Sequence, residues 1–134
     1  VTGAAALTYG HDCHNLTVYG GNDADMALAA NTLRDAQGGL CTAENGKVLT
    51  LIPLPLAGLM CDQSPEALLA QMEQFLADCR RMGFTHKNLL TFFTLMPLAV
   101  SPELKCTDRG LVDALHKRLL PLIEEIKEIS SDGT

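Results

Sequence analysis

The chain has 134 residues, a length that suits one domain spanning residues 1–134. Hydrophobic residues make up 47% of it and aromatic residues 4%, so we expect a sizeable core of aliphatic side chains. The net charge is -6 and no basic patch is visible, which argues against nucleic acid as a partner. No apolar run approaches the ~20 residues of a membrane span, and no signal peptide is present. We therefore predict a cytoplasmic protein that contacts no membrane.

The five cysteines are odd in number and widely spaced, and no C-x-x-C pair exists. This pattern is typical of free, mostly buried thiols in a reducing compartment. The chain starts at Val1 and has no initiator Met, which favours a processed or excised fragment over a complete gene product.

The first part of the chain predicts a strand followed by a helix. Residues 16–19 (Leu-Thr-Val-Tyr) are typical of a short β-strand. Asn22 is a favourable N-cap for a helix over residues 23–37, where apolar side chains recur at helical spacing. We assign Gly38 to the C′ position that ends this helix.

The next segment predicts a β-hairpin. Asn45-Gly46 separates two apolar runs, residues 40–43 and 47–52. This dipeptide between two such runs is the strongest short-range hairpin signal. A proline at position 53 then limits the second strand.

The second half opens with a clear helix. Ser64 and Pro65 are typical of an N-cap and a first helical position, and we expect Gly83 to end the helix. Residues 89–96 are rich in Leu, Thr and Phe and predict a strand, with residues 98–100 as its extension.

The C-terminal third supports two interpretations. We expect residues 102–110 to form a polar connection. Residues 111–129 carry apolar side chains at helical spacing, but Pro121 would kink such a helix, and residues 119–123 fit a strand equally well. We expect the tail, residues 130–134, to fray. Taken together, the elements predict an α+β fold, a mostly antiparallel β-sheet with helices packed on its face.

The most informative motif is the polar segment over residues 10–16, Gly-His-Asp-Cys-His-Asn-Leu. It places two imidazoles, a carboxylate, a thiol and a carboxamide side by side in an otherwise aliphatic region. Such groups are expensive to bury without partners. The segment therefore either faces a ligand or uses Asp12 and Asn15 to satisfy backbone donors in a turn.

Part of this motif has the residue types of a zinc site, because imidazole and thiolate both bind zinc. However, His11, Cys13 and His14 are too crowded to close a tetrahedron easily. The remaining histidines, His86 and His116, lie far along the chain. We therefore expect this chain to bind no metal and no other cofactor by itself.

Two further segments have weaker functional interpretations. Gly20-Gly21-Asn22 before a helix could cradle a phosphate, but it lacks the spacing of nucleotide-binding glycine motifs, and the acidic residues that follow would repel an anion. A second group gathers charged side chains near the C-terminal end: Glu103, Lys105, Asp108 and Arg109. Acid–base catalysis uses such residues, although a solvated loop held by salt bridges is the commoner outcome.

Seven segments follow one another with a distinctive spacing. They are His11 to Leu16, Asn22 to Ala29, Gly38 to Leu40, Gly46 to Leu49, Leu54 to Met60, Pro102 to Lys105 and Thr107 to Asp113. In order and spacing they resemble the C-terminal domain of bacterial adenine deaminase, a member of the amidohydrolase superfamily. The resemblance covers roughly residues 5–115. The family usually carries Ser where this chain has Cys13, so we expect no essential role for that thiol.

The resemblance implies a parent enzyme that hydrolyses adenine to hypoxanthine and ammonia. In that family a metal centre in a (β/α)8 barrel activates water, so the parent is expected to need a divalent metal, Mn, Fe or Zn. The metal ligands and the general acid–base residues lie upstream in the family, and we expect no catalytic residue in this chain. The expected partners are the barrel of the same polypeptide and, through the parent, adenine.

We expect the polar segment to lie close to substrate, because barrel active sites open at one face and need cover to exclude water. The substrate-proximal candidates are His11, Asp12, His14 and Asn15. Two alternatives stay open. The chain could be a structural or oligomerisation module that buries residues 54–60 and 89–100 against the barrel or against another subunit of a homo-oligomer. It could also be a self-sufficient domain that binds a small molecule.

Overall fold

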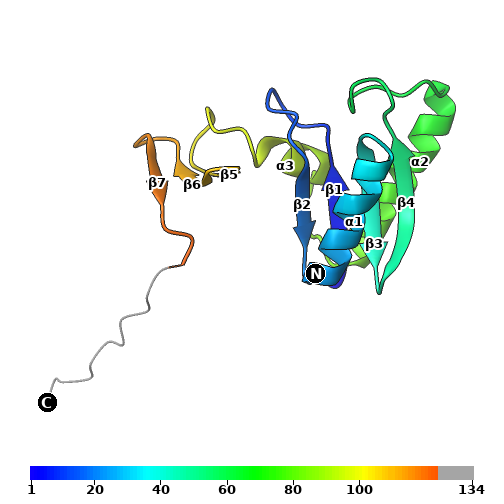
Figure 1. Cartoon of the computed structure of the whole chain (residues 1–134), viewed down its shortest axis with the longest axis horizontal. Helices are drawn as coiled ribbons and strands as arrows, with labels where there is room; N and C mark the ends of the chain where they lie inside the picture. Colours follow the sequence, from blue (N-terminus) through cyan, green and yellow to red (C-terminus); the bar gives the residue numbers. More distant parts are fainter. Residues whose placement is uncertain (124–134) are drawn as a thin grey trace, which may run out of the picture. The chain divides into compact units, whose positions relative to one another are not determined.

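The computed structural model describes residues 1–123, which fall into two compact units. The first unit is Val1–Leu98, and the second begins at Ala99. Both units contain antiparallel sheets, and all three helices found among these residues belong to the first unit (Figure 1). This arrangement confirms the α+β fold class. No described helix is long and apolar enough to cross a membrane.

The first unit is built on a four-stranded sheet in the order β2-β1-β3-β4. Every neighbouring pair of its strands is antiparallel. The strands are β1 (Ala4–Leu7), β2 (Thr17–Gly20), β3 (Gly39–Glu44) and β4 (Lys47–Pro53). The sequence prediction missed β1, whose four residues are all buried and show no alternation of polar and apolar side chains.

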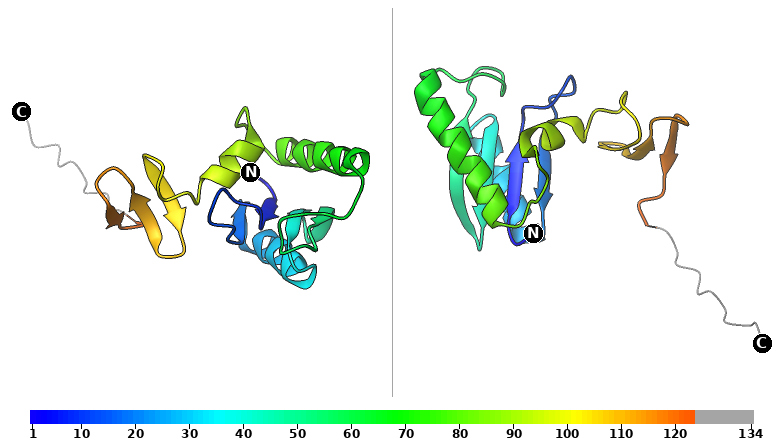
Figure 2. Two further views of the ribbon diagram at one scale, coloured as in Figure 1. Left: turned by 90° about the horizontal axis from the view of Figure 1, so that it is seen from above. Right: turned by 180° about the vertical axis from the view of Figure 1, so that it is seen from behind.

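Helices cover both faces of this sheet (Figure 2). On one face, Ala4 and Ala6 of β1 pack in a small cluster with Ala29 of α1 (Asp23–Asp35). On the other face, Ala5 and Leu7 join the main core with side chains from α2 (Pro65–Arg81) and α3 (Leu89–Leu95). The alternation of side chains along β1 thus divides the core into two layers.

The ends of α1 and α2 follow the rules of helix capping. The side chain of Asn22 accepts from the backbone of Asp25, and that of Ser64 accepts from Ala67, so both predicted N-caps are confirmed. At the C-terminus of α1 the prediction was wrong by one residue. Gln37, with φ of 59°, occupies the left-handed C′ position, and the amide of Gly38 donates to the carbonyl of Leu33.

The predicted hairpin between β3 and β4 is confirmed. Asn45 and Gly46 have φ values of 53° and 73°, which is the pattern of a type I′ turn. A β-bulge between Thr42 and Ala43 shifts the register within the hairpin.

The predicted strand over residues 89–96 is wrong, because this segment forms the helix α3. The side chain of Asn88 caps the helix by accepting from the amide of Thr91, at 3.3 Å. Leu89 and Phe93, four residues apart, are buried in the main core. Helical spacing and a cap therefore outweigh the strand preference of Thr and Phe. Residues 98–100 are not a strand extension and include a turn.

The second unit contains a three-stranded antiparallel sheet in the order β5-β6-β7. Its strands are β5 (Leu104–Thr107), β6 (Gly110–Asp113) and β7 (Arg118–Leu120). The polar connection expected over residues 102–110 is therefore largely a strand and the turn of a hairpin. Of the two interpretations of residues 111–129, the strand interpretation agrees with the part described, and residues 124–134 lie outside it.

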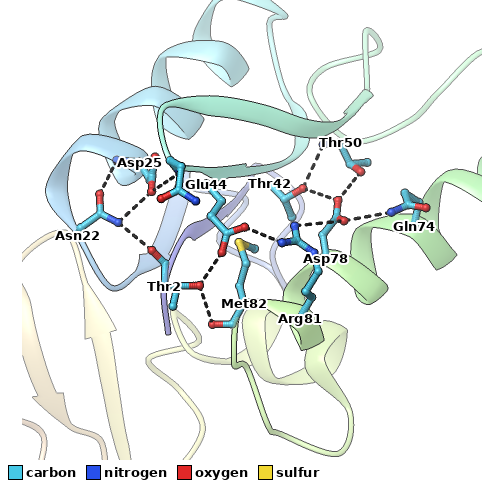
Figure 3. A network of polar contacts seen from close by, with 11 residues as sticks. Thr2, Asn22, Asp25, Thr42, Glu44, Thr50, Gln74, Asp78, Arg81 and Met82 are labelled. Atoms are coloured by element: carbon cyan, nitrogen blue, oxygen red, sulfur yellow. Dashed lines mark hydrogen bonds and ion pairs between the residues drawn. The ribbon is translucent and has the colours of Figure 1, made fainter.

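A network of polar contacts joins the β3–β4 hairpin to α2 (Figure 3). Its centre is Asp78 of α2, a carboxylate that is 5% exposed. Thr42 and Thr50 donate their hydroxyls to it at 3.0 and 2.6 Å. The side-chain amide of Gln74 donates at 3.0 Å. These contacts provide the partners that a buried carboxylate requires.

A second buried carboxylate joins the same hairpin to α1 (Figure 3). Asp25 accepts from the backbone amides of Asn45 and Gly46 at 3.1 and 2.8 Å, and from the side chain of Asn22 at 2.9 Å. The Asn22 amide, followed by the hairpin amides, lowers the pKa of Asp25 below its ordinary value of 3.8. The turn between β3 and β4 is thus fixed by the first turn of α1.

We predict that Asp78→Ala lowers the free energy of unfolding by about 2–3 kcal/mol, because two buried hydroxyls lose a charged acceptor. Urea denaturation followed by circular dichroism measures this change. The matched control is Asp35→Ala, because Asp35 is an exposed residue of α1 paired with Arg34. It should change stability by no more than about 0.5 kcal/mol. Equal effects of the two substitutions would contradict the role given to Asp78.

All five cysteines are free, and they differ in exposure. Burial raises the pKa of Cys41 to about 11 and that of Cys79 to about 12. Cys106 is exposed.

We predict that a thiol reagent at pH 8 modifies Cys106 first and reaches Cys41 and Cys79 only after denaturation. Simultaneous reaction of all five thiols in the native protein would contradict this core.

The raised pKa values of Cys41 and Cys79 also predict a pH dependence. Because these two thiols ionise more readily in the unfolded chain, the free energy of unfolding should fall as the pH rises above 9.

Candidate functional site

The polar segment forms the loop that connects β1 to β2. Its four candidate residues, His11, Asp12, His14 and Asn15, are exposed, whereas Cys13 is half-buried. The loop lies at the same end of the sheet as the turn that follows β4 (Figure 1). The structure therefore places the four predicted residues in one exposed loop of the first unit.

The backbone of this loop is anchored and folded back on itself. The amide of His11 donates to the carbonyl of Thr94, in the last turn of α3, at 3.0 Å. The amide of Cys13 donates to the carbonyl of His11 at 2.8 Å. Asp12 and His14 have φ values of 62° and 47°, in the left-handed region that non-glycine residues seldom adopt. The side chains of these two residues are thus presented by a constrained backbone.

The candidate side chains have few partners. His11 Nδ1 lies 3.4 Å from a carboxylate oxygen of Asp12, and the ring of His14 lies 6.3 Å from that of Tyr9. Within residues 1–123, the side chains of Asp12 and Asn15 do not donate to or accept from any backbone group. The loop therefore has donors and acceptors that its own turn does not use.

No group of three or more His, Cys, Asp or Glu side chains that could hold a metal ion occurs in the described part of the chain. The other two histidines have separate environments. The ring of His86 stacks on Phe92 at 4.9 Å, and His116 contacts Asp113. The zinc interpretation of His11, Cys13 and His14 thus gains no fourth ligand from residues 1–123.

The glycine turn before α1 is packed against the N-terminal residues. The amide of Gly21 donates to the carbonyl of Gly3 at 3.1 Å. A Cβ on Gly21 would lie 1.9 Å from the carbonyl oxygen of Val1, so neighbouring backbone fills the space beside it. The glycine thus allows the backbone of Val1 and Gly3 to approach closely, which favours a plain strand-to-helix turn over a phosphate site.

The charged residues near position 105 lie in the β5–β6 hairpin, and their contacts differ from the expected salt bridges. Lys105 Nζ donates to the carbonyl of Pro102 at 3.0 Å. The hydroxyl of Thr107 donates to the carbonyl of Gly110 at 2.9 Å and closes the turn that contains Asp108 and Arg109. No ion pair involves these charged residues among residues 1–123, so the expected salt bridges are absent there.

A polar cluster that the sequence analysis missed lies in the second unit. Asp113, which is buried, contacts His116 Nδ1 at 2.7 Å and accepts from Arg118 Nε at 3.2 Å. Hydrogen bonds from the backbone and then the side chain of His116 lower the pKa of Asp113 below its ordinary value of 3.8. The i, i+3 spacing of Asp and His was the available signal. Because Asp113 accepts from the amide of His116 as well, the cluster fixes the turn between β6 and β7.

Comparison with known proteins agrees with the family resemblance. Residues 1–118 match the family described as the adenine deaminase C-terminal domain, an extent slightly greater than the sequence motifs indicated. A relative from Moorella thermoacetica is 44% identical over 121 residues, and one from Clostridium botulinum is 47% identical over 123. A third, from Kosmotoga olearia, is 40% identical over 120 residues. All three are named adenine deaminase.

The matched region covers nearly all of this chain but little of its relatives. It includes 90%, 92% and 90% of the chain and 20%, 20% and 21% of the three relatives, in the same order. The chain belongs to the adenine deaminase C-terminal domain family. It spans about a fifth of the length of the curated relatives it matches.

Proposed function

We propose that this chain acts as the C-terminal domain of an enzyme that hydrolyses adenine to hypoxanthine and ammonia, and that it covers the active site of a barrel in the same polypeptide. The family match supports the first part of this proposal. The geometry of the β1–β2 loop supports the second, because it presents His11, Asp12, His14 and Asn15 to solvent from a constrained backbone. Exposed polar side chains on a loop held by a rigid scaffold are characteristic of binding surfaces.

The chemistry of these side chains suits a purine. The ring and exocyclic nitrogens of adenine require both donors and acceptors, and imidazole, carboxylate and carboxamide groups together provide both. A divalent metal, which lowers the pKa of bound water in hydrolases, is expected to be held by the parent barrel. The task of this chain is then to exclude water and to orient either the purine or a barrel side chain.

The second candidate is a structural or oligomerisation module, and β4 favours it. This strand lies at one edge of the sheet in the first unit. Val48, Leu49 and Leu51 on it are 40%, 39% and 37% exposed. An edge strand with apolar side chains is a ready surface for another chain or domain. In this function the β1–β2 loop would only shape a turn.

We predict that His14→Ala or Asp12→Ala in the full-length protein lowers kcat for adenine by about 30- to 1000-fold, the loss expected when one well-placed transition-state contact is removed. Stability should fall by no more than about 1 kcal/mol, because both side chains are exposed and the main cost is that alanine adopts the left-handed backbone of these positions less readily. The value of kcat and the melting temperature are measured on the same preparations.

The control is Cys13→Ser, which should leave both quantities nearly unchanged because the family that the chain resembles usually has Ser at this position. A wild-type kcat combined with a marked fall in melting temperature for His14→Ala would favour the structural module instead.

We predict that the purified 134-residue chain does not deaminate adenine, even with added Mn, Fe or Zn, because residues 1–123 supply no set of three convergent metal ligands. Ammonia release measures the activity. Turnover on the order of 1 per second would contradict the assignment of catalysis to the parent barrel.

A further inference from the structure

Thr8 is the first residue of the β1–β2 loop, and its hydroxyl joins this loop to two distant segments of the chain. Thr8 Oγ1 accepts from the backbone amide of Gly39, at the start of β3, at 2.8 Å. The same hydroxyl donates to the carbonyl of Gly58, in the turn after β4, at 2.7 Å. The backbone amide of Thr8 donates to the carbonyl of Gly39 at 3.0 Å. The side chain therefore uses its donor and an acceptor position on backbone groups of distant residues.

Two glycines, Gly38 and Gly58, allow the backbone to approach the Thr8 hydroxyl closely. Gly38 and Gly58 have φ values of 117° and 71°. A Cβ on Gly38 would lie 2.5 Å from the Cα of Gly58 and 3.0 Å from Thr8 Oγ1. A Cβ on Gly58 would lie 3.2 Å from the same hydroxyl. The backbone of both segments thus approaches Thr8 as closely as packing allows.

A second anchor, at His11, holds the loop against α3. His11 donates its amide to the carbonyl of Thr94 in α3. The hydroxyl of Tyr19, in β2, donates to the carbonyl of Phe93 at 2.8 Å and fixes the same end of α3. Between the anchors at Thr8 and His11 the chain has little freedom, and the exposed residues follow immediately.

We propose that Thr8 is a positioning residue that sets the conformation of the His11–Asn15 loop by fixing its start to Gly39 and Gly58. This inference rests on the proposed function, in which that loop lies at the active site. Removal of the hydroxyl leaves the amide of Gly39 and the carbonyl of Gly58 without this partner. The start of the loop and the turn after β4 are then free to separate, and the exposed side chains lose their orientation.

The test compares Thr8→Val, which keeps the shape but removes the hydroxyl, with Thr8→Ser, which keeps the hydroxyl. In the full-length protein we expect Thr8→Val to lower kcat for adenine by about tenfold or more. Thr8→Ser should keep most of the wild-type kcat. The matched control is Thr32→Val, because Thr32 donates its hydroxyl to Leu28 within α1. It should lower stability slightly and leave kcat unchanged.

A double-mutant cycle separates positioning from general stability. If Thr8 acts through the loop, adding Thr8→Val to His14→Ala should lower kcat much less than Thr8→Val does alone. Equal losses in both backgrounds, or a wild-type kcat for Thr8→Val when His14→Ala is impaired, would overturn the inference while the proposed function stands.

A second readout keeps the inference testable without catalysis. In the 134-residue chain, Thr8→Val should accelerate hydrogen exchange of the His11 and Cys13 amides, and Thr8→Ser should not. Unchanged exchange in Thr8→Val would overturn the inference. Faster exchange together with a wild-type kcat for His14→Ala would support the positioning of the loop by Thr8 and reject its place at the active site.

Discussion

The first unit depends on the complete enclosure of β1. This strand lies between β2 and β3, and its four residues are buried. Three of them are Ala, which lets α1 pack closely on one face while Leu7 contributes to the main core on the other. A strand fixed on all sides cannot shift its register without moving every layer. The residue that follows it, Thr8, therefore starts the polar loop from a well-defined point.

Two buried carboxylates hold the β3–β4 hairpin, at the other edge of the sheet, against the helices. Asp25 holds the tip of the β3–β4 hairpin against α1, and Asp78 holds its middle against α2. A buried carboxylate is, by its chemistry, as good a candidate for a binding site as the polar loop. Yet both carboxylates are surrounded by donors from the protein itself, so nothing remains for a ligand to satisfy. Their function is to hold the hairpin between the two helices.

The parts of the fold that follow local rules could be predicted from the sequence, and those set by distant contacts could not. Asn22, Ser64 and the Asn45-Gly46 turn act within a few residues, and each forms as its type requires. Residues 89–95 are an exception, because the cap Asn88 and the spacing of Leu89 and Phe93 indicate a helix locally, whereas the content of Thr and Phe favoured a strand. The enclosed β1 lacks any alternating pattern, and this is why it was missed.

The same distinction applies to the candidate site. Its residue types were visible in the sequence, because His11 to Asn15 are adjacent. Their exposure became evident only in three dimensions, as did the absence of backbone partners for the side chains of Asp12 and Asn15 within residues 1–123. The anchors supplied by Thr8 and Thr94 were equally invisible in the sequence. A turn that served only the fold would use its own polar groups, as the Thr107 turn does. The β1–β2 loop differs: Gly39, Gly58 and Thr94 hold its backbone, and its exposed side chains are those that the proposed contact with substrate would use.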